Sequence, residues 1–195
     1  MRFTQYVFLL LLNLNTFSLA QAQKHFYDIF MGEEIVGSMT VEKKIINDLE
    51  IYTMESRLKI NLFKEIENNF IIKTHYKNGR LSHSFFENYM NQSLKERTEV
   101  VSKNGKLHIS KEKHQWTIPE VPFSVIRAYF EKPEKHQEIF SERLGEFLPC
   151  KKVAPSAYSL KVSMMKESKF YYDGNQCIRV EGKFGPAAFI FQKRR

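Results

Sequence analysis

Cysteine, glycine and proline are all scarce in this sequence. Two Cys among 195 residues are too few for a disulfide scaffold or a cysteine-rich zinc module. Eight Gly and six Pro are too few for a low-complexity linker or a collagen-like fibre. Apolar residues make up 43% and charged residues 27% of the chain, which are globular proportions, and the length suits one domain.

Familiar catalytic and cofactor motifs are missing as well. The sequence has no G-x-S-x-G elbow, P-loop, G-x-G-x-x-G, H-E-x-x-H or EF-hand loop. We therefore expect a protein that is not an enzyme and that uses no cofactor or metal ion. An envelope hydrolase, which would need a cluster of acidic or histidine side chains that the sequence does not reveal, stays open as an alternative.

The N-terminal segment has the parts of a cleavable secretory signal. Arg2 gives a positive start, residues 6–12 form a short apolar run, and Ala20-Gln21-Ala22 is an A-x-A cleavage site. Two asparagines end the apolar run before it could span a bilayer. The sequence predicts a signal peptide over 1–22, cleaved after Ala22 or Ala20, and a periplasmic or secreted domain over 23–195 that is not a transmembrane protein. A buried N-terminal helix is the alternative.

The positive charge is dispersed along the chain. The formal net charge is +8, and the one dense basic cluster is Lys193-Arg194-Arg195. No basic recognition helix is visible, so nucleic acid is not an expected partner. The basic tail leaves open an attraction to an anionic envelope surface or to an envelope protein.

Alternating apolar and polar residues, broken by turn signals about every ten residues, predict an antiparallel all-β domain. The first strands are expected over 25–30, 35–41 and 51–62. Gly37 lies inside the second of these, where glycine marks a bulge or a close backbone approach. The expected architecture is a curved sheet, either a half-barrel or an open barrel meander.

Asn78-Gly79 is the strongest hairpin signal, because Asn-Gly tolerates the positive φ angles of a type I′ turn. A two-residue turn there predicts three cross-strand pairs on one inner face: Tyr76 with Leu81, Thr74 with His83, and Ile72 with Phe85. His75 then falls on the opposite face from His83, so the two are not expected to share a metal ion.

Two further pairs repeat this signal. Asn104-Gly105 predicts a hairpin whose inner face carries Val100, Leu107 and Ile109. Asp173-Gly174 predicts another hairpin, and a last strand is expected over 187–191.

Residues 122–132 break the β pattern. Phe123, Ile126 and Phe130 have helical spacing, and a proline stands just before them and another just after residue 132. The pattern predicts one short helix whose apolar stripe lies against the sheet or plugs one end of it.

Cys150 and Cys177 allow one disulfide in an oxidising compartment, which would add about 3–4 kcal/mol by restricting the unfolded chain. If Ile178 and Val180 face inward, alternation turns Cys177 outward and argues against the bond. Both states stay open.

Several runs together resemble a family of exported proteins with a domain of unknown function. They are Tyr27-Asp28-Ile29 followed by Gly32 and Ile35-Val36-Gly37, then residues 119–133, and then residues 140–149. The resemblance implies a curved antiparallel sheet with a helix, similar to the half-barrels of periplasmic lipoprotein carriers.

The sequence has 17 Phe and 9 Tyr, which either pack as a core or line a cavity if the sheet curls without filling itself. We expect a binding module for an apolar or amphipathic envelope ligand such as a lipid. The residues expected to contact this ligand are Ile72, Tyr76, His83, Phe85, Phe123, Tyr129 and Phe130. A structural or protein-interaction module with a filled core is the alternative.

Overall fold

The structure is a computed structural model that describes residues 21–61, 65–163, 166–184 and 187–195. These residues form β1 (Gln21–Met31), β2 (Glu34–Ile46), β3 (Leu49–Asn61), β4 (Glu65–Lys77), β5 (Arg80–Met90), β6 (Ser93–Lys103), β7 (Lys106–Lys111), β8 (His114–Ile118), the 3-10 turn η1 (Arg127–Tyr129), β9 (Glu138–Ser141), β10 (Glu146–Ala154), β11 (Ala157–Ser163), β12 (Lys166–Asp173), β13 (Gln176–Phe184) and β14 (Ala187–Lys193). Residues 1–20 of the predicted signal peptide lie outside the described residues, and β1 begins just before the predicted cleavage after Ala22.

All the strands belong to one antiparallel sheet that is not closed. Its order is β8-β7-β6-β5-β4-β3-β2-β1-β14-β13-β12-β11-β10-β9. The first and last strands of the chain therefore pair at the centre, with Tyr27 opposite Lys193. The expected all-β curved sheet is confirmed.

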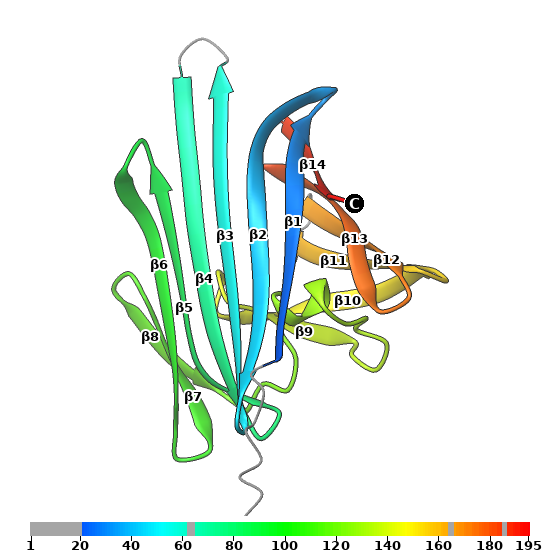
Figure 1. Cartoon of the computed structure of the whole chain (residues 1–195). Coiled ribbons are helices and arrows are strands. Elements are labelled where there is room, and N and C mark those ends of the chain that lie inside the picture. The colour runs from blue at the N-terminus through cyan, green and yellow to red at the C-terminus, as the bar shows by residue number, and fades with distance from the viewer. Residues whose placement is uncertain (1–20, 62–64, 164–165, 185–186) are drawn as a thin grey trace, which may run out of the picture.

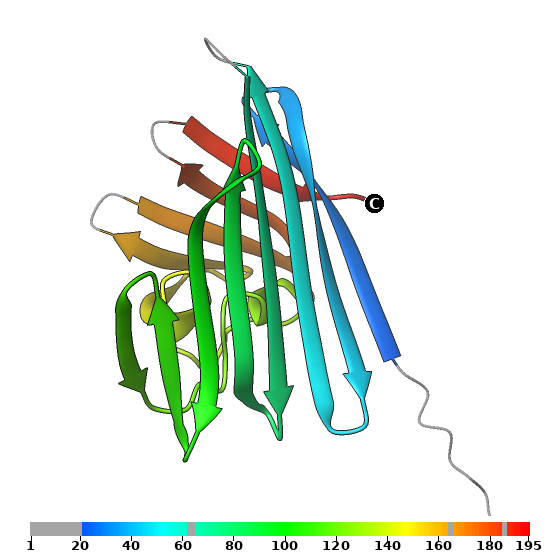
Figure 2. The ribbon, with the colours of Figure 1, turned by 90° about the vertical axis from the view of Figure 1, so that its left-hand side faces the viewer.

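The sheet curls so strongly that its two halves face each other. The long strands β1–β6 form one wall, and the shorter strands β10–β14 cross behind them (Figures 1 and 2). The segment 119–137 leads from edge strand β8 to edge strand β9 and carries η1. Sheets of this size curl because each strand is twisted relative to its neighbour.

Gly37 has both properties expected of it. The register between β1 and β2 shifts beside it, because Ile29 pairs with Gly37 whereas Phe30 pairs with Ile35. A Cβ at Gly37 would overlap the carbonyl oxygen of Arg57 and would lie 2.9 Å from the Cα of Leu58. The bulge and the close approach let β2 bend as it follows the curve of the sheet.

The hairpins expected from Asn-Gly and Asp-Gly are present. Asn104 and Gly105 have φ angles of 55° and 71°, and Val100 pairs with Ile109 on the buried face, where Leu107 also lies. Around Gly174, Asp173 pairs with Gln176. These signals are reliable because the turn requires positive φ angles that few residues adopt.

The register of the β4–β5 hairpin differs from the prediction beyond its first pair. Tyr76 does pair with Leu81, but a bulge follows between His75 and Tyr76, so His75 pairs with His83. Further along, Thr74 pairs with Ser84 and Ile72 with Phe86. A one-residue shift exchanges the two faces of a strand. His83 and Phe85 therefore lie on the outer face with His75. The expectations that His83 and Phe85 point inward, and that His75 and His83 lie on opposite faces, were wrong.

The predicted helix over 122–132 is reduced to the single 3-10 turn of η1. Ser124 instead forms a parallel bridge with Phe140, and the N–H of Val125 donates to the carbonyl of Phe140 at 2.8 Å. These contacts hold the start of the segment in an extended form. Its apolar residues are nevertheless buried, because Phe123 and Ile126 are only 5% and 0% exposed.

Tyrosines build the core next to this turn. The ring of Tyr27 packs edge-on against Tyr129, and that of Tyr52 packs edge-on against Tyr76, both with centres 5.6 Å apart. Several of the buried tyrosine hydroxyls donate hydrogen bonds, which offsets the cost of burying them: Tyr27 to the carbonyl of Cys177, Tyr76 to the hydroxyl of Ser124, and Tyr172 to the carbonyl of Ala128. This part of the interior is filled.

Candidate functional site

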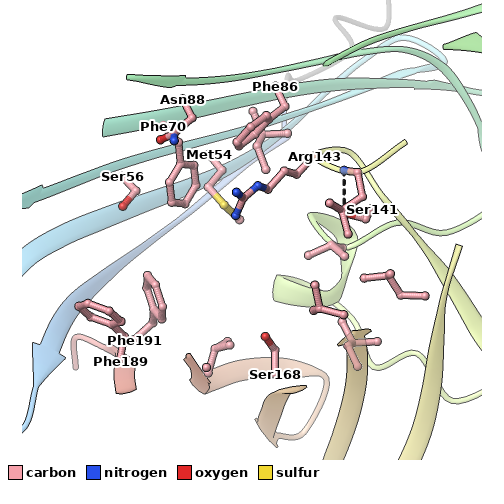
Figure 3. A pocket seen from close by; sticks show the side chains of 18 of the residues that line it. Met54, Ser56, Phe70, Phe86, Asn88, Ser141, Arg143, Ser168, Phe189 and Phe191 are labelled. Carbon is pink, nitrogen blue, oxygen red and sulfur yellow. Dashed lines mark hydrogen bonds between the residues drawn. The ribbon is translucent and has the colours of Figure 1, made fainter. Parts of the chain in front are cut away.

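A cavity of about 480 Å³ lies beyond the tyrosine core, between the two halves of the sheet (Figure 3). Within the described chain, it is lined by Ile29, Met54, Ser56, Leu58, Asn68, Phe70, Ile72, Phe86, Asn88, Val125, Tyr129, Ser141, Arg143, Leu144, Glu146, Leu148, Leu160, Val162, Glu167, Ser168, Phe170, Val180, Gly182, Lys183, Phe189 and Phe191. Both sequence alternatives for the aromatic residues thus hold in part, since one region is packed and the other encloses a cavity.

Strand alternation explains the change from core to cavity. On β3 the inward positions after Tyr52 are Met54, Ser56 and Leu58, and these three line the cavity. Side chains become shorter or polar along the strand, so they no longer meet the opposite half of the sheet. The curled sheet therefore leaves space at this end.

Most of the wall is apolar. Phe70 on β4 and Phe86 on β5 lie side by side with ring centres 6.2 Å apart, and Phe189 and Phe191 of β14 face them from across the cavity (Figure 3). Apolar walls with a few placed polar groups are typical of sites for small molecules and lipids.

Two asparagines supply a fixed polar spot in this wall. The Asn68 side-chain amide donates to the Asn88 side-chain oxygen at 2.9 Å and to the carbonyl of Tyr89 at 3.3 Å. Both side chains are less than a tenth exposed. They line the cavity beside Ser56, so a bound molecule could find hydrogen-bonding groups here.

The Arg143 side chain extends toward Met54 in the wall formed by β3–β5 (Figure 3). Its guanidinium lies 5.7 Å from the ring centre of Phe86, and its Nε donates to a carboxylate oxygen of Glu96 at 2.9 Å. Glu146, Glu167 and Lys183 also line the cavity. The cavity therefore has charges of both signs around an apolar interior.

The turn that carries Arg143 joins the two edges of the sheet. Thr98 on β6 donates to the Arg143 carbonyl at 2.7 Å, and the indole N–H of Trp116 on β8 donates to the Gly145 carbonyl at 3.1 Å. Gly145 has a φ of 71°, and a Cβ there would lie 2.7 Å from the Trp116 ring and 2.8 Å from Ile109. Only glycine satisfies both requirements.

Glu142 lies buried under this turn and is 1% exposed. Its Oε1 accepts the backbone N–H of Ile126 at 3.2 Å, whereas its Oε2 has no hydrogen-bond partner. Burial raises the pKa of Glu142 to about 7, because the nearby Ser124 hydroxyl and backbone N–H groups offset only part of the lost hydration. Ser124 also accepts the hydroxyl of Tyr76 at 2.7 Å.

The residues expected to contact a ligand are dispersed. Ile72 and Tyr129 line the cavity. Tyr76 and Phe123 are buried in the core but do not line it. Phe130 borders a separate polar hollow with His25, and His83 and Phe85 lie on the outer face as described above.

Sequence reasoning missed most of the cavity wall. Asn68, Asn88 and Ser168 are polar residues at inward strand positions, and such positions mark places where a sheet face is not fully packed. Arg143 could not have been found in this way, because its place depends on a turn that docks across the sheet.

The structure contains no disulfide between Cys150 and Cys177, which are both free and buried. A register shift between Tyr171 and Tyr172 pairs Tyr172 with Cys177, so Cys177 faces inward with Val180 rather than outward. Burial raises the pKa of Cys150 to about 11 and that of Cys177 to about 12. Both thiols are therefore protonated and poorly nucleophilic.

The basic tail is partly built into the sheet. Lys193 pairs with Tyr27, and Arg194 forms a salt bridge with Asp28 with an N–O distance of 2.6 Å. Within the described residues, no helix is both long and apolar enough to cross a membrane.

A curled, open antiparallel sheet around an apolar cavity defines a β-barrel-like protein. The chain belongs to the family of the domain of unknown function DUF6134, whose model matches residues 27–195. This confirms the expectation that the chain belongs to a family with a domain of unknown function. A comparison with curated proteins gave no match.

A similar solved structure is the β-barrel-like protein of domain of unknown function DUF1849 from Brucella abortus. The TM-score is 0.56 at 10% sequence identity, and the match covers 88% of this chain and 95% of the other. The likeness concerns the fold alone and extends over nearly the whole sheet.

Proposed function

We propose that this protein is a non-enzymatic binding protein of the cell envelope whose cavity holds an apolar or amphipathic ligand such as a lipid. The observation that carries the proposal is the cavity of about 480 Å³ with its mainly apolar wall. Its volume lies within the range of small-molecule sites, roughly 300–1,000 Å³.

The chemistry of the wall favours binding over catalysis. No histidine or cysteine of the described residues lines the cavity, and both cysteines are buried protonated thiols. The polar groups of the cavity wall, such as the Asn68–Asn88 pair and Arg143, are suited to binding the polar headgroup of an amphipathic ligand. The envelope location rests on the predicted signal peptide.

Native mass spectrometry of the protein purified from an exporting host, followed by organic extraction, tests the proposal. We expect a stoichiometric amphiphile in the extract. A fluorescent fatty acid, cis-parinaric acid, serves as the probe for affinity. An apo mass together with no saturable binding of the probe would refute the proposal.

Two matched variants locate the binding. Ser168 and Lys169 are neighbours on β12, and only Ser168 lines the cavity. Ser168→Phe fills part of the cavity and should weaken probe binding about tenfold or more. Lys169→Phe adds the same ring outside the cavity and should leave probe binding unchanged. Equal effects of the two variants would place the probe elsewhere.

A further inference from the structure

Two histidines lie directly opposite each other on the outer face of the sheet, away from the cavity. His75 on β4 pairs with His83 on β5 because of the bulge next to Tyr76. Their ring centres are 5.6 Å apart, with the ring planes at 50°. Directly opposed side chains on antiparallel strands are held close together by the backbone.

One ring nitrogen of His75 lacks a hydrogen-bond partner, which is unusual for a histidine on a sheet surface. Its Nε2 is buried and has no hydrogen-bond partner. An imidazole nitrogen without a hydrogen-bond partner can donate a lone pair to a metal ion.

His83 is accessible to solvent and lies beside the carboxylate of Glu99. Its side chain is 37% exposed, and its Nε2 lies 3.8 Å from a carboxylate oxygen of Glu99 on β6. A carboxylate beside a metal-binding histidine orients the ring and increases its basicity. Arg97, 3.6 Å from the other Glu99 oxygen, competes for this charge.

We propose that His75 and His83 form a two-nitrogen surface site for Zn²⁺, with water as the remaining ligands and Glu99 as an outer carboxylate. Zn–N bonds of about 2.0–2.1 Å place two imidazole centres on one tetrahedral ion roughly 5 Å apart, close to the separation in this pair. No group of three histidine, cysteine or acidic side chains that could hold a metal occurs among the described residues. The site is therefore bidentate and of modest affinity.

Competition with a chromophoric zinc chelator tests the site on the full chain without a histidine tag. We expect one equivalent of Zn²⁺ to bind, and His75→Ala and His83→Ala each to weaken that binding about tenfold or more. His108→Ala is the matched control, because His108 is an exposed histidine on β7 opposite Val101 rather than another histidine. It should leave the zinc affinity unchanged.

The two histidine variants check each other, because the two side chains come from different strands of an intact hairpin. Far-UV circular dichroism confirms that each variant is folded. Zinc binding that survives in both variants, or that falls equally in His108→Ala, would overturn the proposal. So would a wild-type chain that fails to compete with the chelator.

Discussion

Replacing the buried Glu142 by glutamine should stabilise the protein at neutral and alkaline pH. The folded protein holds this carboxyl away from water, with one oxygen on the N–H of Ile126 and the other without a partner. Glutamine keeps the acceptor for Ile126 and has nearly the same shape, but it carries no charge to desolvate. The variant therefore imitates the protonated wild type.

The size and sign of the effect follow from the pKa. In the unfolded chain Glu142 ionises near 4.5, whereas the folded protein holds its proton up to a pKa of about 7. The folded state thus binds more protons between these values, so the stabilisation is complete below the lower one and is lost as the pH rises through the higher one. Each pKa unit corresponds to about 1.4 kcal/mol, so ionisation lowers the free energy of unfolding by roughly 3 kcal/mol.

Urea unfolding followed by circular dichroism at about pH 5 and about pH 8 measures this difference. The free energy of unfolding of Glu142→Gln should exceed that of the wild type by less than about 1 kcal/mol at the lower pH and by about 3 kcal/mol at the higher pH. Glu138→Gln, at an exposed position of β9, controls for a general change in charge. A difference that is the same at both pH values would refute the reasoning.

Three other perturbations have definite outcomes. Gly145→Ala should lower the free energy of unfolding by more than about 2 kcal/mol. Gly105 has the same φ but no atom near its Cβ, so Gly105→Ala should lower it by only about 1 kcal/mol. Equal losses in urea unfolding would show that the Trp116 ring moves aside at little cost. Burial, aided by Lys193, lowers the pKa of His25 to about 4, so stability should fall as the pH drops below 6.5, and this part of the loss should be absent in His25→Gln. Thiol titration with a chromogenic disulfide should be slow for the folded protein and should release two equivalents rapidly in denaturant, because both cysteines are buried; rapid reaction without denaturant would contradict this burial.

The sequence predicted those features that depend on local chemistry. The Asn104-Gly105 hairpin and the Gly37 bulge follow from conformations that these residues favour and others avoid. The β4–β5 register could not be predicted in the same way. Beside the bulge, the N–H of Leu81 donates to the carbonyl of Val121 at 2.9 Å, and nothing in the hairpin itself indicates that contact.

The cavity could not be predicted from local sequence either, because it depends on how distant parts of the sheet meet. Alternation predicted an inner face, but the volume enclosed depends on how far the sheet curls before β10–β14 meet β3–β5. The helix over 122–132 failed for a related reason, since the bridge of Ser124 with Phe140 outweighed a helical pattern only a few turns long.

Because β1 pairs with β14, the order of strands across the sheet is the order that a chain with joined ends would have. The N–H of Arg194 donates to the carbonyl of Phe26, so the end of β14 lies beside the early part of β1. If the N- and C-terminal ends were joined, the strands would follow one another from β9 to β14 and then from β1 to β8, each beside the one before it. The two ends of the described chain meet at the β1–β14 pair, and segment 119–137 connects the two edge strands of the sheet, β8 and β9. A circular permutant opened between the exposed residues Glu134 and Lys135 of that segment would keep every pair of neighbouring strands and make each pair local in sequence, which favours rapid folding.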